Sequence, residues 1–365
     1  MTPQFLRRRL VGTISALALL VGATAGALSP AASAAPAAPA PSATAGLYGA
    51  ADPTYDGVYR QSLALLGLEA IGAKPAPQAV TWLLNQQCRD GSFEAYRADL
   101  STPCSAPDPK NFTGPDTNST SLALMALMAL QDHASASPTL IGRAIDAATK
   151  ASDWLTRQQG ADGGFPWTSG GASDANSTGL SLAAMLSMAP GFDFPAYKKA
   201  TRYLGSLSAS CAAGGGFAFQ SGGAPNASAT AQGLVGIVGT LPVAASRRPA
   251  VAAPCANTAK AKAASYLTRA LASTGTLSSP YGSDPDYANT AAAVLGLVGA
   301  GQGRAAIAKA TAALTAAAPA FATHSGGPDP GAIGLLLQVA AATGGKPSAF
   351  GGVNLVSLLS SSMRK

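Results

Sequence analysis

The chain has 365 residues, of which only 11% are charged, with 24 Lys and Arg against 17 Asp and Glu. A typical soluble domain has about a quarter charged residues, so this chain is expected to bury many small alanine and glycine side chains instead. Its basic residues are scattered and form no stripe with interleaved aromatics, which argues against nucleic acid as a partner.

Residues 1–34 are predicted to be a secretory signal peptide. Arginines at 7–9 precede a mostly apolar run from Leu10 to Val21, and the small residues Ala32-Ser33-Ala34 suit cleavage. The apolar run is too short to remain as a membrane span. We therefore expect a secreted, extracellular protein, exported by the general or the twin-arginine route, with no membrane span after signal removal.

Three further segments follow the signal. Residues 35–52 are rich in Ala and Pro and are predicted to be a linker, residues 53–350 a folded domain, and residues 351–365 a C-terminal tail. Four cysteines in an exported chain suggest two disulfides, and proximity along the chain favours pairing Cys88 with Cys104 and Cys211 with Cys255. Their spacing is not that of a zinc knuckle, so we expect neither a metal site nor a cofactor.

An internal repeat is the main signal in the predicted domain. An apolar helix from Asp56 to Ile71 comes first, without a partner. The clearest full copy has an amphipathic helix from Ile145 to Gln159, a glycine turn at 162–165, and an almost uncharged helix that begins at Asp174 and runs through Met188. About five or six such helix pairs can be traced, and the last covers residues 305–341.

The two kinds of helix predict the architecture. The amphipathic helices can face water on one side, whereas the apolar helices must be buried on most sides. An open solenoid would expose its terminal apolar helices. We therefore predict an all-α fold, an α/α toroid in which a ring of buried helices lies inside a ring of amphipathic helices, as a double-ringed barrel.

Two residue types recur at fixed places in the repeat. A phenylalanine that follows the glycine turn is predicted to fill the space between neighbouring helices, at Phe93, Phe165 and Phe217. An aspartate where each apolar helix starts is predicted to cap that helix. The predicted caps are Asp56, Asp116, Asp174, Asp286 and Asp329.

The glycine turns resemble a known motif. Gln87, Gly91 and Phe93, and likewise Gln159, Gly163 and Phe165, resemble the QW motif of squalene and oxidosqualene cyclases, with Phe in place of the usual Trp. The block that begins at Asp116-Thr117 looks like the inner-helix signature of the prenyltransferase, squalene-cyclase and transcobalamin superfamily. The resemblance covers roughly residues 53–345, and it implies an (α/α)6 toroid whose ligand lies in the central cavity.

The branches of this superfamily differ in their chemistry. Protein prenyltransferases bind zinc through Asp, Cys and His, but this chain has only His133 and His324, and neither is beside a cysteine. Class II terpenoid cyclases start by protonation from a DxDD motif. The nearest match runs from Asp284 to Tyr287 and lacks the last acid, which leaves Asp286 as a weak catalytic candidate. The thioester branch needs a Cys and Gln close together in a glycine turn, and no such pair is present.

Three functions follow from these comparisons. The main hypothesis is a secreted, non-catalytic binding protein, nearest in character to the transcobalamin and intrinsic factor branch, that binds a corrinoid or another bulky small molecule such as an isoprenoid. The alternatives are a degenerate class II terpenoid cyclase and a cell-envelope module that binds a protein partner. Whether the protein is an enzyme stays open, with the residues arguing against it.

Aromatic residues near the glycine turns are the predicted ligand contacts, because aromatics combine a large apolar area with a polar group. They either contact a ligand at the mouth of the barrel or pack between neighbouring loops. The candidates are Tyr96, Trp167, Phe219, Tyr281 and Tyr287.

Overall fold

Two kinds of helix alternate along the part of the chain that the structure describes. The computed structural model describes residues 43–111, 113–132, 137–188, 195–239, 241, 249–279, 282–324 and 327–365. The predicted signal peptide therefore lies outside the described residues. Residues 41–365 form one unit by their contacts and are considered by themselves.

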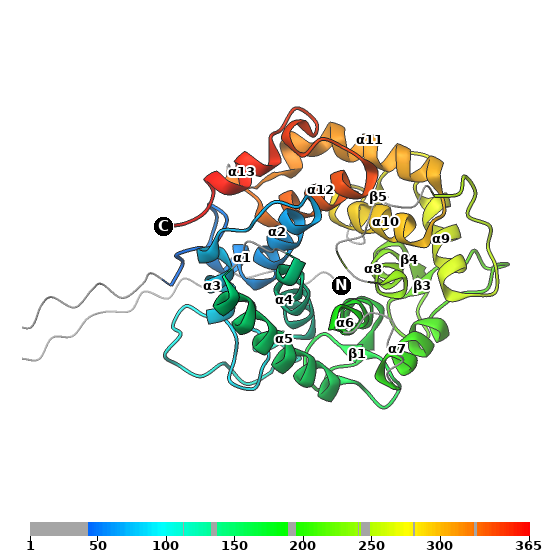
Figure 1. Ribbon diagram of the computed structural model, residues 1–365. Coiled ribbons are helices and arrows are strands. Elements are labelled where there is room, and N and C mark those ends of the chain that lie inside the picture. The colour runs from blue at the N-terminus through cyan, green and yellow to red at the C-terminus, as the bar shows by residue number, and fades with distance from the viewer. Residues whose placement is uncertain are drawn as a thin grey trace, which may run out of the picture. The chain divides into compact units, whose positions relative to one another are not determined.

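The apolar helices form a closed ring within this unit. They contact one another in chain order, and the last of them, α12, contacts the first, α2 (Figure 1). Their low charge leaves no face suited to water, so each is buried by its two neighbours and by the outer layer. The inner helices are α2 (Val58–Ala70), α4 (Thr117–Ala129), α6 (Ala175–Met188), α8 (Ala227–Val238), α10 (Tyr287–Ala300) and α12 (Pro330–Thr343).

Glycine pairs bring two of these helix contacts very close. A Cβ atom on Gly67 of α2 would lie 2.6 Å from the carbonyl oxygen of Gly334 on α12, and one on Gly236 of α8 would lie 2.3 Å from that of Gly179 on α6. No larger side chain fits at these positions. The glycine-rich composition thus has a structural cause, because it allows the inner helix backbones to touch.

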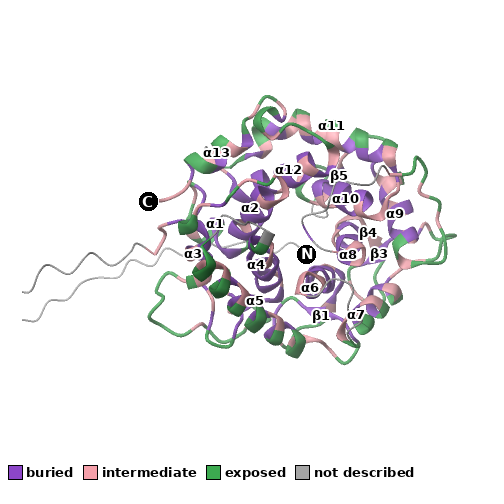
Figure 2. Ribbon diagram, in the orientation of Figure 1, coloured by how far each residue is buried: buried purple, intermediate pink, exposed green. Residues whose placement is uncertain are grey.

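The amphipathic helices cover the outside of the ring. Helices α5, α9 and α11 each contact the two inner helices beside them, and α13 packs on α12. Figure 2 shows the inner helices mostly buried and the outer helices with an exposed side. The outer helices are α3 (Pro77–Asn85), α5 (Pro138–Gln158), α7 (Pro195–Ser206), α9 (Ala259–Ala270), α11 (Arg304–Phe321) and α13 (Leu355–Ser361), with the single turn α1 (Pro53–Asp56) before α2.

Short antiparallel hairpins connect most outer helices to the next inner helix. Phe165 pairs with Asp174, and Phe217 pairs with Asn226. Phe93, Phe165 and Phe217 are fully buried, as predicted. The hairpin strands are β1 (Phe165–Pro166), β2 (Ser173–Asp174), β3 (Phe217–Ala218), β4 (Pro225–Asn226), β5 (Leu277–Ser278), β6 (Pro285–Asp286), β7 (Thr323–His324) and β8 (Gly327–Pro328), and the 3-10 turns are η1 (Leu130–Asp132) and η2 (Pro347–Ala349).

Two of these hairpins also hold the neighbouring repeat. The first N–H group of α4, on Thr117, donates to the Trp167 carbonyl (2.8 Å), and that of α6, on Ala175, donates to the Phe219 carbonyl (2.9 Å). The Gln159 amide donates to Gly163 in its own turn (2.9 Å) and to Ala196 on α7 (2.8 Å). The QW-like glutamine therefore ties a turn to the next outer helix.

Four of the predicted caps are present. Asp116, Asp174, Asp286 and Asp329 each accept a hydrogen bond from the N–H group three residues later, at 2.8–3.0 Å. The prediction for Asp56 was wrong. Helix α2 begins at Val58 after Gly57, and the buried Asp56 carboxylate forms an ion pair with Arg364 instead (3.0 Å).

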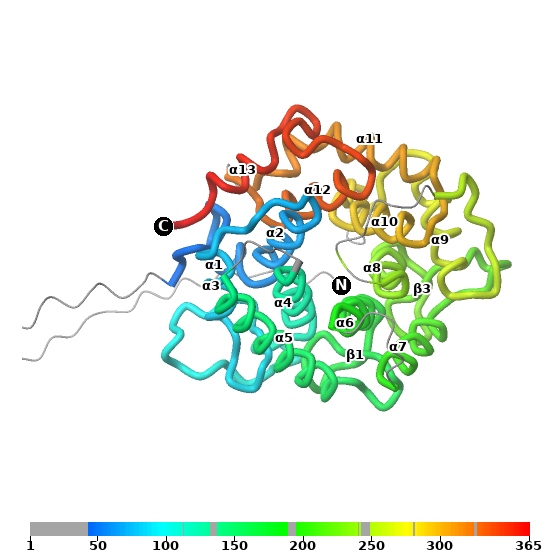
Figure 3. The backbone as a smooth tube through the Cα atoms, viewed as in Figure 1, coloured from blue at the N-terminus to red at the C-terminus, as the bar shows by residue number. Residues whose placement is uncertain are grey.

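The chain ends belong to the folded unit, which differs from the predicted linker and tail. Leu47 and Tyr48 are buried, and α13 packs on α12. The Gly46 N–H donates to the Arg364 carbonyl (2.9 Å), and the Arg364 N–H donates to the Leu47 carbonyl (2.8 Å). Figure 3 shows the C-terminal segment beside the first described residues. The two ends meet because α13 supplies the outer helix that α2 lacks in the sequence.

Two disulfides are present with the predicted pairing, Cys88 with Cys104 and Cys211 with Cys255. Both lie in connections between helices. Among the described helices, none is long and apolar enough to cross a membrane.

Candidate functional site

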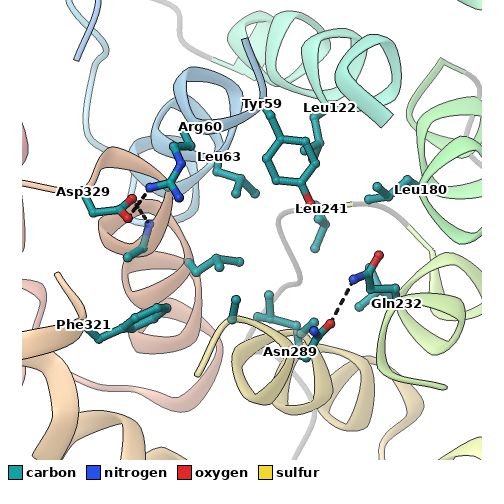
Figure 4. Close-up of a pocket in the computed structure, with 17 residues that line it drawn as sticks. Tyr59, Arg60, Leu63, Leu122, Leu180, Gln232, Leu241, Asn289, Phe321 and Asp329 are labelled. Atoms are coloured by element: carbon teal, nitrogen blue, oxygen red, sulfur yellow. Dashed lines mark hydrogen bonds and ion pairs between the residues drawn. The ribbon is translucent and has the colours of Figure 1, made fainter. Parts of the chain in front are cut away.

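A cavity of about 220 Å³ lies in the middle of the ring of inner helices (Figure 4). All six inner helices contribute to it, which follows from their apolar character on every side. Its described lining residues are Tyr59, Arg60, Leu63, Leu122, Leu180, Gln232, Val235, Leu241, Ala288, Asn289, Ala292, Leu295, Phe321, Asp329, Gly331, Ala332 and Leu335.

An ion pair forms one polar spot on this apolar wall. Arg60 on α2 is paired with Asp329, whose carboxylate also accepts from the Ala332 N–H at the start of α12 (3.0 Å). The guanidinium carbon of Arg60 lies 3.6 Å from the centre of the Tyr55 ring. Both charges are therefore occupied by partners from the protein itself.

A pair of amides forms a second polar spot across the cavity (Figure 4). The Gln232 side-chain N–H donates to the side-chain amide oxygen (Oδ1) of Asn289 (2.9 Å). The Asn289 amide in turn donates to the Asp286 carboxylate (2.7 Å). Asp286 thus caps α10 and orients a side chain of the cavity wall.

Tyr59 projects into the cavity between these two spots (Figure 4). The residue is 39% exposed because its ring faces the open space at the centre. Among the described residues, no hydrogen-bond partner is found for its hydroxyl group. Although the ring is partly exposed to this central space, the surrounding protein keeps the hydroxyl from bulk water, and this desolvation, with a smaller effect of the Asp116 charge, raises the Tyr59 pKa to about 12. The phenol is consequently a neutral donor and acceptor at physiological pH.

Two depressions adjoin the cavity at the N-terminal ends of the inner helices. One, of about 490 Å³, shares Tyr59 with the cavity, and the other, of about 560 Å³, shares Gln232, Asn289 and Phe321. The mouth of the ring is therefore continuous with the cavity through these side chains.

Three of the five predicted ligand contacts lie around this mouth, and none of the four described ones lines the cavity. Tyr96 and Trp167 line the first depression, and Tyr287 lines the second. Trp167 and Phe219 are both 44% exposed, and Phe219 lines neither depression. Tyr281 lies outside the described residues. The repeat explains the equivalent placement of Trp167 and Phe219, because the carbonyl group of each holds the neighbouring inner helix while its ring stays partly exposed.

Sequence reasoning missed the two aromatic residues of the cavity, Tyr59 and Phe321. Tyr59 lies in the first turn of the first apolar helix. An aromatic residue at that position was the sequence feature that could have pointed to the cavity. Phe321 ends α11, beyond the predicted end of that helix, and its ring lies 5.5 Å from that of Tyr287.

Burial changes the acidity of the caps near the mouth. The Asp116 carboxyl is enclosed beside Trp167, and its burial raises its pKa to about 6 although the Ser119 N–H favours the ionised form. Burial also raises the pKa of Asp174. Asp286 lines the second depression.

The described residues offer little for metal binding. Cys88, Glu94 and Cys104 bring three potential ligand atoms within 4.8 Å of one another, but both sulfurs form a disulfide. His324 stacks on Tyr55 with ring centres 4.6 Å apart, and His133 lies outside the described residues.

Comparisons with known proteins place the fold. No family model matches the sequence, and no curated protein matches it. Two solved structures of MstE, a type II terpene cyclase from Scytonema, are similar to the chain at 14% identity with a TM-score of 0.51. One of these structures holds the MstE substrate, geranylgeranyl dihydroxybenzoate, and the match covers 83% of this chain and 79% of MstE. The other holds the MstE product, merosterolic acid A, and the match covers 83% of this chain and 80% of MstE. The chain therefore has a terpenoid cyclase-like, all-α toroid fold.

Proposed function

We propose that the central cavity binds a small isoprenoid-like molecule and that the protein is a carrier or receptor for it. The observation that carries this proposal is an apolar cavity at the centre of the ring in which the two charged residues are paired with each other. Its volume of about 220 Å³ exceeds that of an engineered cavity of about 150 Å³ that binds benzene. A short isoprenoid chain suits this space, and a longer one extends into the depressions at the mouth.

The corrinoid of the main sequence hypothesis suits this cavity less well. A corrinoid is a broad macrocycle with polar amide groups, whereas the cavity is narrow and lined mainly by leucine, alanine and valine. A corrinoid would have to lie over the mouth, on Trp167 and Tyr287. We therefore do not carry the likeness to the transcobalamin branch into the proposal.

The charges near the cavity favour binding over catalysis. A cyclase that starts by protonation needs a carboxylic acid that holds its proton near the substrate. Asp329, the only acid among the described lining residues, is paired with Arg60 and caps α12. The Asp286 carboxylate accepts hydrogen bonds from both the backbone and the side chain of Asn289. Neither is arranged as a proton donor, and Asp116, whose pKa burial raises to about 6, lines the depression at the mouth and not the cavity.

A class II cyclase is the second candidate, and the likeness of fold to MstE favours it. Its test is product formation from geranylgeraniol or squalene, analysed by gas chromatography and mass spectrometry. A cyclic product that disappears in Asp286→Asn, with folding unchanged because Asn also caps helices, would replace the carrier proposal by the cyclase.

Three finer predictions stay with the proposal. We propose that the inner and outer helices make one double-ringed barrel of six helix-pair repeats, closed by the chain ends. We also propose that the protein is secreted, with which its two disulfides are compatible. A cell-envelope protein that delivers or receives the ligand remains the proposed partner.

Ligand titration with cavity and mouth variants tests the proposed site. Geraniol is titrated into the purified protein by calorimetry to obtain its dissociation constant. In a separate unfolding experiment, geraniol at about 100 times that constant should raise the apparent free energy of unfolding by roughly 2.7 kcal/mol. Leu180→Trp fills the cavity and is expected to weaken binding at least tenfold. Trp167→Ala, at the mouth of the ring, is expected to leave binding unchanged. The opposite pattern would move the ligand to the mouth, as the sequence predicted.

A further inference from the structure

The charges of the central cavity and its mouth limit the kind of ligand that can enter, and this inference rests on the proposed function. Arg60 and Asp329 are the only ionic side chains among the described residues that line the cavity. They form an ion pair, so the net charge of the lining is zero.

The Arg60 charge is balanced by Asp329, and one face of its guanidinium is covered by the Tyr55 ring. Asp329 binds its guanidinium at one Nη, and the Tyr55 ring lies 3.6 Å from its central carbon. A carboxylate or phosphate group at Arg60 would either lie beside the Asp329 carboxylate, which repels it, or displace Asp329 and leave that carboxylate partly buried without its partner. The cavity therefore lacks the unpaired basic groups with which proteins bind such heads.

The mouth adds a second barrier to anions. Glu94 and Asp116 line one depression, and Asp284 and Asp286 line the other. Among the described residues that line either depression, none is Lys or Arg. A ligand with a negative head would be repelled on its way in and would lose its hydration inside.

Neutral hydrogen-bonding groups are available instead. The Tyr59 hydroxyl points into the cavity, and the Gln232 side chain lies on the opposite wall (Figure 4). A hydroxyl or carbonyl group of a ligand can pair with either of them. A cationic head finds no unpaired acid in the cavity, because Asp329 is occupied by Arg60 and the other described lining residues carry no charge.

We propose that the central cavity selects uncharged ligands that carry a hydroxyl or carbonyl group, and that Asp329 enforces this selection by neutralising Arg60. Asp329 is then a specificity-determining residue. Replacing its carboxylate with an amide should free Arg60 and turn the cavity into a site for carboxylates. The helix cap should survive, because Asn226 caps α8 in the same way, accepting from the Ala229 N–H at 2.9 Å.

The test uses three ligands with one carbon skeleton: geraniol, geranic acid and geranylamine, titrated at neutral pH into the full protein. The wild type is expected to bind geraniol at least tenfold more tightly than the acid or the amine. Asp329→Asn is expected to bind geranic acid at least tenfold more tightly than the wild type does. Tyr59→Phe is expected to weaken geraniol binding about threefold to tenfold, the value of one hydrogen bond.

The matched control is Asp174→Asn, which also removes one carboxylate from an inner-helix cap but frees no arginine. Equal gains in acid binding for both variants would show a general charge effect and overturn the inference. Wild-type binding of the acid or the amine as tight as that of geraniol would also overturn it, while leaving the proposed function intact. Failure of all three ligands to bind would overturn the proposed function and this inference together. The wild-type series decides even if Asp329→Asn does not fold.

Discussion

The connection between α5 and α6 and the place where α13 meets residues 43–49 have similar structures, but only the first is a continuous stretch of chain. Between α5 and α6 the chain runs from outer helix through glycine turn to inner helix, and the Phe165 N–H donates to the Thr178 hydroxyl (2.9 Å). At the closure, the outer helix is α13 (Leu355–Ser361), near the C-terminus, and the turn beside it is formed by residues 43–49, which precede α2. There the Tyr48 N–H donates to the Gln61 side chain (2.9 Å), in place of the threonine.

The glycines of the two turns show how alike they are. Gly163 has φ +88° and Gly46 has φ +92°. A Cβ atom at Gly163 would lie 2.8 Å from the Lys199 carbonyl oxygen of the next outer helix, and one at Gly46 would lie 2.2 Å from that of Gln78. The closure thus reproduces an ordinary repeat without a peptide link, and it depends on non-covalent contacts that can be removed one at a time.

The largest expected effect is at the closure. Arg364→Met leaves the buried Asp56 carboxylate without its ion pair and removes the side-chain hydrogen bonds to Gly49 and Ala51. Removing one partner of a buried pair costs about 3–5 kcal/mol, so the free energy of unfolding in urea should fall by about that amount. Limited proteolysis should also cut near residues 43–57 sooner than in the wild type.

A second variant separates the buried charge from the lost packing. Asp56→Asn together with Arg364→Met is expected to recover part of the loss, because no uncompensated carboxylate remains. If Arg364→Met has the stability and cleavage pattern of the wild type, then the chain ends do not close the ring.

The next effect is at the covalently linked turn. Gly163→Ala forces a side chain into the left-handed region and against the Lys199 carbonyl, for which we expect a loss of roughly 2–5 kcal/mol. Gly170→Ala is the matched control, since Gly170 has φ +81° but open space where the Cβ would be. It should cost only about 1–2 kcal/mol in thermal unfolding. Equal losses would mean that the contact with the next outer helix is unimportant.

The smallest expected effect is a pH dependence of the free energy of unfolding caused by Asp116. Unlike Asp56, which is paired with Arg364, Asp116 has no basic partner among the described residues. Burial raises the Asp116 pKa from 3.8 to about 6. The folded state therefore binds more protons than the unfolded state between about pH 4 and pH 6, and stability is lost as the pH rises through that window, by up to about 3 kcal/mol.

Asp116→Asn keeps the helix cap and removes this ionisation. Urea unfolding at a series of pH values should show the variant similar to the wild type at pH 4 and more stable by about 2–3 kcal/mol at pH 7. A difference between the two proteins that does not change with pH would contradict the assigned burial of the Asp116 carboxyl.

Local sequence patterns predicted the parts of the fold that local chemistry governs. The buried phenylalanines, four of the aspartate caps and both disulfides could be predicted, because each depends on residues at fixed offsets or on cysteine proximity. Asp56 was assigned wrongly for the same reason. Its position before an apolar helix suggested a cap, but its partner Arg364 lies 308 residues away in the sequence.

By itself the sequence determined that two kinds of helix alternate, since their apolar periodicity decides which faces can meet water. Only the tertiary structure decided where the ring closes and what its centre contains. Tyr59, Arg60 and Asp329 meet there because α12 lies against α2, a contact between the last and first inner helices that no local pattern encodes. The predicted aromatics at the mouth lie near the glycine turns of the repeat and Asp329 is one of its caps, whereas Tyr59 and Arg60 lie at no recurring position, and for that reason the repeat could not reveal them.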